Sequence, residues 1–383
     1  MWLLAVLLLV WVGYFDSYAL KPLKTRTVDV GEMKLSTLGV GTWSWGNRFV
    51  QQSTYASSFI HRCKCSHHVL FLHSFLWQYS EDEDVALQET FDYLLDAGVN
   101  WFDTADSYGT GELKGQSEKL LGKFDVAYMQ KKNLKTSKCK FATKLAPFPS
   151  RIGSESMYKA GLESIGRLQR SIDIVQLHWP PYWVVPQVNR WFEKEYFTAF
   201  DRLIKENRAV QIGVSNYGAN TMRVAQEVAI SCGSKIYTNQ VQFSMLSRYP
   251  LENGLADACE DLGIQLIGYS PLALGLLSDK YTLTNLPKGP RALLFKEFLP
   301  KIQNLLDVLR DIAKKRRKTV SQVVLNWNLQ KGFLLLVGVR NVLQAKENLG
   351  AVGWALSDGE IMEIDNAARK VKGQLVQNSF QTK

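Results

Sequence analysis

The feature that most constrains the fold is a regular alternation of short apolar segments and longer amphipathic ones, which recurs from Leu38 onward. The apolar segments are rich in β-branched residues, as is typical of strands buried on both faces of a parallel sheet. Eight are present: LGVGTW (38–43), VNWFD (99–103), KFATK (140–144), IDIVQLH (172–178), VQIGVS (210–215), YTNQVQF (237–243), QLIGYS (265–270) and FLLLVGV (333–339). Eight strands alternating with helices fit either a closed barrel or a doubly wound sheet.

The segments between the strands carry helix patterns and end in residues that stop helices. Residues 83–97 place apolar side chains on one broad face, and Gly98 suits the position after the helix end. Gly263 and Gly332 follow later helices in the same way, and the second of these helices starts near Thr319. No G-x-G-x-x-G motif follows the first strand, which counts against a Rossmann fold. For a chain of 383 residues, this favours an α/β fold, a single-domain (β/α)8 TIM barrel.

Charge and cysteine content exclude several classes of protein. The formal net charge is +10, but the basic residues are scattered, and the densest run, Lys314 to Lys318, ends a predicted helix. Cations suit the negative end of a helix dipole, and no nucleic-acid-binding signature accompanies them, so we expect no nucleic-acid partner. Five cysteines, an odd number at low density, imply no disulfide framework.

The N-terminal segment, residues 1–24, stands apart from the barrel pattern. Residues 1–20 form an apolar run with no preceding basic residue, too short for a clear membrane span and unlike a secretory signal. A signal anchor, an unusual targeting segment and a misplaced start codon all remain open. Association with a membrane is expected only if this segment is retained.

Polar side chains lie at or just beyond the carboxyl ends of three neighbouring strands, where barrel enzymes build their sites. Asp103 ends the second strand with Tyr108 five residues on, Lys144 ends the third and His178 the fourth. Singly, each is more often a cap, a turn former or a surface residue. Together they predict an acid: an ammonium lowers the pKa of a nearby phenol, and a buried ammonium needs a carboxylate partner. We therefore predict that Lys144 lowers the pKa of Tyr108 and pairs with Asp103. His178 would orient a substrate carbonyl.

The motifs around these residues resemble, in order, those of the aldo-keto reductases, notably the plastid-type members of plants. They are GTWSWG, WFDTADSYG, ATKLAP, DIVQLHWP, IGVSN, NQVQFSML and GYSPLALGLLSDKY, and the resemblance spans about residues 25 to 370. It implies an NADP-dependent reductase of small-molecule aldehydes or ketones. The implied catalytic residues are Asp103, Tyr108, Lys144 and His178, with Tyr108 protonating the carbonyl oxygen as hydride arrives from NADPH.

The resemblance also implies a cofactor site. Residues expected around the nicotinamide are Thr42, Trp43, Asp103, Ser215, Asn216, Gln240 and Tyr269. A loop over the pyrophosphate is expected from Ser270, Pro271, Leu272, Lys280 and Arg291, and the adenosine end from Gly338, Arg340, Gln344, Glu347 and Asn348. Because arginine binds phosphate by bidentate hydrogen bonds, Arg340 would favour the 2′-phosphate of NADP.

The expected barrel domain spans residues 25–375, and a C-terminal tail follows at 376–383. Within the domain, residues 50–76 interrupt the family pattern between its first two motifs. This segment holds four of the five histidines and no acidic residue. A metal site of Cys63, Cys65, His67, His68 and His73 is the alternative, but the spacing is not the usual one, so no metal is expected. We predict a translated retained intron that contributes no ordered catalytic element.

Two further alternatives remain open. A non-catalytic NADP-binding regulatory or sensor subunit could use the same barrel, because fold alone does not prove catalysis. The resemblance favours a chloroplast location, with a cytoplasmic or membrane-anchored protein (through residues 1–20) as alternatives.

Overall fold

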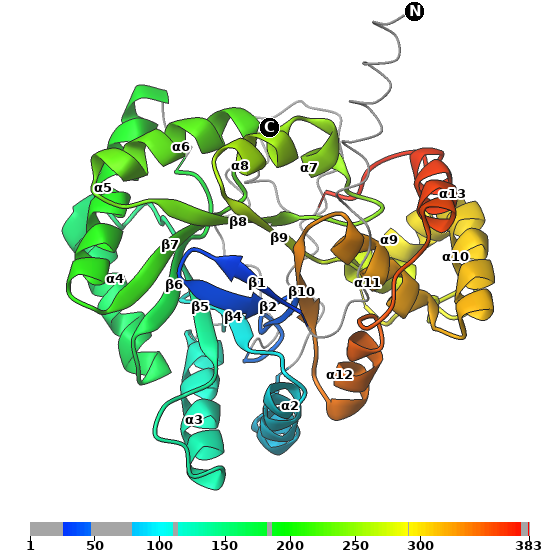
Figure 1. The fold of residues 1–383 in the computed structure, drawn as a ribbon, viewed down its shortest axis with the longest axis horizontal. Coiled ribbons are helices and arrows are strands. Elements are labelled where there is room, and N and C mark those ends of the chain that lie inside the picture. The colour runs from blue at the N-terminus through cyan, green and yellow to red at the C-terminus, as the bar shows by residue number, and fades with distance from the viewer. Residues whose placement is uncertain are drawn as a thin grey trace, which may run out of the picture.

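The eight expected strands close into a parallel barrel in a computed structural model of the chain (Figure 1). Around the barrel the strand order is β10-β3-β4-β5-β6-β7-β8-β9. Their bounds are β3 (Leu38–Gly41), β4 (Trp101–Ala105), β5 (Lys140–Leu145), β6 (Ile172–Leu177), β7 (Ala209–Ser215), β8 (Ile236–Gln242), β9 (Gln265–Tyr269) and β10 (Leu334–Gly338). Every neighbouring pair is parallel, including β10 with β3, which confirms the barrel and rules out the doubly wound sheet.

The structure describes residues 26–46, 79–109, 114–181, 186–289, 291–376 and 382, with the side chains of 186–189 left out. The predicted N-terminal segment (1–24) and the predicted intron (50–76) lie outside these residues, as does most of the tail. Within the described ranges, no helix combines the length and the apolar character needed to cross a membrane.

Helices surround the barrel on its outside (Figure 1). The α-helices are α2 (Asp84–Asp96), α3 (Gln116–Lys131), α4 (Gly153–Leu168), α5 (Pro186–Lys205), α6 (Ala219–Ser231), α7 (Tyr249–Glu252), α8 (Leu255–Asp261), α9 (Arg291–Phe298), α10 (Gln303–Arg316), α11 (Val320–Gln330), α12 (Val342–Leu349) and α13 (Asp358–Arg369). The 3-10 helices are η3 (Glu81–Glu83), η5 (Ala273–Ser278) and η6 (Leu299–Ile302). The main apolar core lies between these helices and the outer face of the barrel.

Helix ends fall where the sequence predicts them. Gly98, Gly263 and Gly332 have φ of 89°, 64° and 84°, the left-handed backbone that ends a helix and that glycine adopts most readily. Thr319 begins α11, with its side-chain oxygen accepting a hydrogen bond from the Gln322 amide. The basic run that starts at Lys314 lies in the last turn of α10 and just beyond it, as expected.

One element was not predicted: an antiparallel hairpin of β1 (Thr27–Val30) and β2 (Met33–Ser36). Its apolar side chains Val30, Met33 and Leu35 pack in a cluster with Trp101 and Ile174. Trp101 is the first residue of β4, so the hairpin covers the amino end of the barrel (Figure 1). The opposite, carboxyl end is left for the polar residues.

Candidate active site

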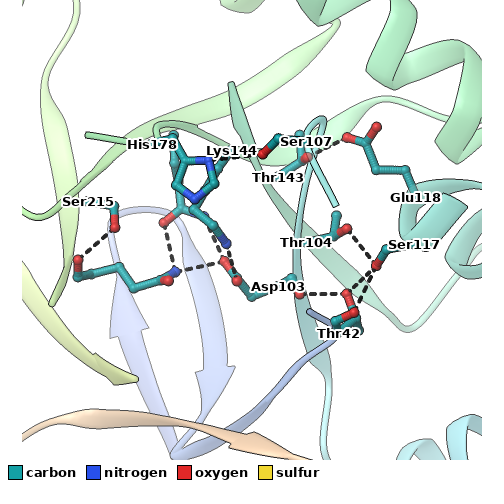
Figure 2. Close-up of polar contacts among 12 residues, drawn as sticks. Thr42, Asp103, Thr104, Ser107, Ser117, Glu118, Thr143, Lys144, His178 and Ser215 are labelled. Carbon is teal, nitrogen blue, oxygen red and sulfur yellow. Dashed lines mark hydrogen bonds and ion pairs between the residues drawn. The ribbon is translucent and has the colours of Figure 1, made fainter. Parts of the chain in front are cut away.

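A buried ion pair lies inside the carboxyl end of the barrel. The ammonium group of Lys144, on β5, donates to Oδ2 of Asp103, on β4, and the two residues are only 1% and 2% exposed. Residue 103 pairs with Gly41 and residue 144 with Ala105 in the parallel ladders, so neighbouring strands bring the two side chains together. The predicted partnership of Lys144 with Asp103 is therefore present (Figure 2).

Two side-chain amides complete the environment of the Asp103 carboxylate. Nε2 of Gln176 and Nε2 of Gln240 donate to Oδ1 at 2.9 and 2.7 Å. Gln176 was not among the predicted site residues, although it lies two residues before His178 and so on the same face of its strand. Gln240 was expected around the nicotinamide; in the structure its amide group donates to Asp103.

Tyr108 and His178 lie at the mouth of the barrel, above this pair. The ammonium of Lys144 is 4.8 Å from the centroid of the Tyr108 ring. The Tyr108 and His178 rings meet edge to face, with centroids 5.8 Å apart, and Oγ of Ser107 lies 3.4 Å from Nδ1 of His178. The structure thus brings together all four residues that the family resemblance assigns to catalysis.

The pKa of Tyr108 differs from the sequence-based expectation. Burial raises it well above its ordinary value, and the negative charge of Asp103 adds to the shift. The predicted lowering by Lys144 is thus wrong for this state, because Lys144 is already paired with a carboxylate and the phenol is removed from water. Burial also lowers the pKa of Lys144, with Asp103 opposing that shift. For His178, burial and the charge of Lys144 lower the pKa well below its usual range, which keeps the imidazole neutral.

A network of hydroxyl groups supports Asp103 from the β3 side (Figure 2). Oγ1 of Thr42 donates to the backbone carbonyl of Asp103 at 2.8 Å and lies 2.6 Å from Oγ of Ser117. The Thr104 hydroxyl donates to Ser117 at 2.9 Å. Thr42 is thus fixed toward Asp103 and α3, while the next residue, Trp43, is half-buried at the carboxyl end of β3. Ser117 was not predicted as a site residue.

A second ion pair, between Asp106 and Arg151, lies beside the site. Asp106 is 1% exposed and pairs with Arg151, which also donates to the carbonyl oxygen of Ala146 at 2.7 Å. Burial raises the pKa of Asp106, and the charge of Arg151 opposes the shift. This pair fixes the loop that carries Tyr108 to the loop after β5. Sequence reasoning missed it, because Arg151 lies beyond the strand end and has no motif of its own.

Residues assigned to the nicotinamide cluster after β7 and β9. The Tyr269 hydroxyl donates to Oδ1 of Asn216 at 3.0 Å, and the Asn216 amide donates to Oγ of Ser215 at 3.0 Å. Asn216 and Ser270 have φ of 67° and 56°, a left-handed backbone that costs on the order of 1–3 kcal/mol per non-glycine residue and concentrates at functional sites. The Ser215 hydroxyl also donates to the backbone carbonyl of Gln240 at 2.9 Å, so Tyr269, Asn216 and Ser215 form a hydrogen-bonded chain that leads to Gln240.

The expected pyrophosphate residues lie in the segment after β9. Pro271 is buried and Leu272 half-buried, while Lys280 is exposed. Lys280 and Arg291 approach the ring of Tyr281, with the ammonium 5.6 Å and the guanidinium carbon 5.4 Å from its centroid. Arg291 was expected in a loop; it is the first residue of α9, and it donates to the Leu274 carbonyl at 3.3 Å. Two of the three predicted phosphate-binding cations therefore share one neighbourhood.

The expected adenosine residues lie between the end of β10 and the last turn of α12. Oε1 of Gln344 accepts from the backbone amide of Arg340 at 2.8 Å, and the Asn348 amide donates to the Gly338 carbonyl at 3.4 Å. The Arg340 guanidinium is paired with Glu83, and the Glu347 carboxylate accepts from the Thr319 hydroxyl. Both charged side chains at this end, Arg340 and Glu347, thus already have partners within the protein.

No cluster of three or more His, Cys, Asp or Glu side chains suited to a metal ion occurs among the described residues. The five residues of the alternative metal site, Cys63 to His73, lie outside them.

Comparisons with known proteins agree with this geometry. The aldo/keto reductase family model matches residues 73–369. The chain is 37% identical over 370 residues to the chloroplastic pyridoxal reductase of Arabidopsis thaliana, covering 95% of this chain and 93% of the relative. It is 27% identical over 286 residues to a probable aldo-keto reductase of Glycine max, covering 72% and 77%.

Solved structures share the fold. The glycerol dehydrogenase of Gluconobacter oxydans superposes with a TM-score of 0.69 at 22% identity, covering 94% of this chain and 99% of that one. A Bombyx mori aldo-keto reductase solved with NADP gives 0.60 at 17% identity, covering 90% and 93%. With the family model matching most of the chain and a relative at 37% identity along nearly all of it, this protein belongs to the aldo/keto reductase family of oxidoreductases.

Proposed function

We propose that this protein reduces aldehydes or ketones to alcohols with NADPH, and that Tyr108 is the proton donor. One observation carries the proposal: Tyr108 and a neutral His178 meet at the mouth of the barrel, directly above the buried pair of Lys144 and Asp103. A hydroxyl donor, a neutral imidazole and a desolvated ammonium are the groups needed to protonate a carbonyl oxygen as negative charge develops on it.

Each side chain has a distinct part in this chemistry. Bound NADPH would supply a hydride to the carbonyl carbon. The Tyr108 hydroxyl keeps its proton at neutral pH because burial raises its pKa, and it gives the proton up only to an oxygen that has become strongly basic. The ammonium of Lys144 would then stabilise the phenolate that remains. His178, neutral through its lowered pKa, would donate a hydrogen bond that orients the carbonyl.

The carboxyl end of the barrel suits a dinucleotide phosphate. Lys280 and Arg291 offer cations after β9, and Arg340 offers a third at the start of α12. Left-handed backbone at Asn216, after β7, and at Ser270 and Leu274 (φ 59°), after β9, concentrates along two loops that would hold the cofactor. A charge-assisted contact from Arg340 to the 2′-phosphate would favour NADPH over NADH by roughly ten- to a hundredfold in affinity, while Lys280 and Arg291 would bind the pyrophosphate that both cofactors carry.

The substrate class and location follow from the relatives. A chloroplastic pyridoxal reductase shares 37% of residues along 95% of this chain, so we propose pyridoxal as an aldehyde substrate and the plastid as the location. Aromatic rings beside His178 suit such a flat ring: Trp179 lies 4.7 Å from His178 and 6.0 Å from Phe148, centroid to centroid.

The test is NADPH oxidation, followed by its absorbance, with pyridoxal, other aldehydes and ketones, together with Kd values for NADPH and NADH from fluorescence quenching. We expect turnover of at least one aldehyde and tighter binding of NADPH. Binding without turnover of any carbonyl would instead favour the regulatory or sensor subunit, and equal Kd values would contradict the role of Arg340.

A further inference from the structure

The cation expected at the 2′-phosphate is already engaged by a carboxylate. A terminal guanidinium nitrogen of Arg340 donates to Oε1 of Glu83, and the two side chains are 23% and 36% exposed. Oε2 of Glu83 is closed off from solvent and has no hydrogen-bond partner among the described residues. Within the described residues, this oxygen is therefore a buried acceptor whose hydrogen-bonding capacity is unused.

The topology of the barrel brings these two residues together. Glu83 ends η3, just before α2, and Arg340 lies between β10 and α12. β10 and β3 are neighbours where the barrel closes, with Gly338 opposite Gly41, and α12 packs beside α2 (Figure 1). Glu83 makes no side-chain hydrogen bond that caps α2, so its carboxylate is not committed to the helix end.

A phosphate that approached Arg340 would meet negative charge as well as positive. The guanidinium is shared with Glu83, and the same turn carries Glu81 and Asp82. A carboxylate repels a phosphate dianion, but it accepts a hydrogen bond from a hydroxyl group. Glu83 is therefore unfavourable for a ribose that carries a 2′-phosphate and favourable for one that carries a 2′-hydroxyl.

We propose that Glu83 is a specificity-determining residue, which competes with the 2′-phosphate of NADPH for Arg340 and so narrows the preference for NADPH over NADH. This inference rests on the proposed use of NADPH. A positioning role would have the opposite sign: if Glu83 only held Arg340 ready for the phosphate, removing its charge would weaken NADPH binding.

The experiment compares Glu83→Gln with the wild-type protein by tryptophan fluorescence quenching with NADPH and with NADH. We expect the ratio of Kd for NADH to Kd for NADPH to rise by about three- to tenfold, mostly through tighter NADPH binding. The matched control is Asp82→Asn, which removes the same charge one residue away. Asp82 accepts from the Ser80 hydroxyl at 3.2 Å and pairs with no described cation, so its ratio should change less than twofold, by rough estimate.

A double variant separates competition from general repulsion. In the Arg340→Gln background, Glu83→Gln should give a much smaller gain in NADPH affinity, because there is no longer a shared guanidinium. The inference is overturned if Glu83→Gln weakens NADPH binding, if its ratio changes no more than that of Asp82→Asn, or if its gain persists without Arg340. Failure of the wild-type protein to bind NADPH would instead overturn the proposed function.

Discussion

The two ends of the barrel interior are built from the same strands but have opposite chemistry. At the amino end, Trp101, Ala142 and Ile174 join the hairpin in an apolar cluster. Two residues further along the same strands lie Asp103, Lys144 and Gln176, which form the polar layer. Because strand side chains repeat every two residues, each strand places one residue in each layer.

Side chains at the amino end are packed so closely that Gly39 has no room for a side chain. A Cβ added at Gly39 would lie 2.1 Å from the Trp101 indole, and the Trp101 ring nitrogen donates to the Ser36 carbonyl at 2.8 Å. On its amino side, the polar layer therefore packs against this buried apolar layer and not against water. Removal from water is what shifts the pKa values of Lys144 and Tyr108, so the apolar layer contributes to the chemistry of the polar one.

The largest effect, on the catalytic rate, is expected from a substitution at the polar end of the barrel. Tyr108→Phe keeps the ring but removes the proton donor, and loss of a general acid typically costs on the order of 10²–10⁴ in rate. NADPH affinity and thermal stability should stay close to wild type. The control is Tyr128→Phe, which removes a hydroxyl that donates to Asp96 far from the site. Aldehyde reduction by Tyr108→Phe at a rate near that of this control would refute the assignment.

A substitution at the apolar end should have the converse effect: it should lower stability and leave the catalytic rate of the folded protein unchanged. Ile174→Ala empties part of the closed layer and should lower the free energy of unfolding by about 2–5 kcal/mol. Its matched control is Ile230→Ala on α6, where the side chain is 60% exposed and a change within about 0.5 kcal/mol is expected. Denaturant titration measures both. Equal losses of unfolding free energy for the two variants would mean that the apolar layer at the amino end is not tightly packed.

The smallest effect is expected at Glu193, a buried carboxylate that, unlike Asp103, has no salt bridge to any cation that the structure describes. Glu193, on α5, is 1% exposed and accepts from the Tyr217 hydroxyl at 2.9 Å. Burial raises its pKa from 4.5 to about 7. The folded state therefore binds this proton more tightly than the unfolded state, so stability from this group is fully present below about pH 4.5 and is lost as pH rises to about 7.

Glu193→Gln stays neutral at every pH, so it should remove this dependence. Relative to the variant, the wild-type protein should lose on the order of 1–3 kcal/mol between those two pH values. Unfolding free energies of both proteins across that range measure the difference, in which the other titrating groups cancel. A constant difference across the range would show that Glu193 titrates normally.

The amino-acid sequence by itself determined the strands and the helix ends. Eight apolar segments became the eight barrel strands, and Gly98, Gly263 and Gly332 ended helices as expected, because periodicity and backbone preference act over a few neighbouring residues. The family motifs also located the four residues of the site, since they lie on or just after three neighbouring strands, β4, β5 and β6.

Only the tertiary structure decided how these residues are partnered. The strands of the hairpin over the amino end have four residues each, too short to stand out as a pattern, and they are held by a barrel assembled from distant segments. Gln176 on Asp103 and Glu83 on Arg340 are separated by 73 and 257 positions. The pKa of Tyr108 moved opposite to expectation, because desolvation depends on every atom packed around a group, and that surrounding exists only after the barrel has closed.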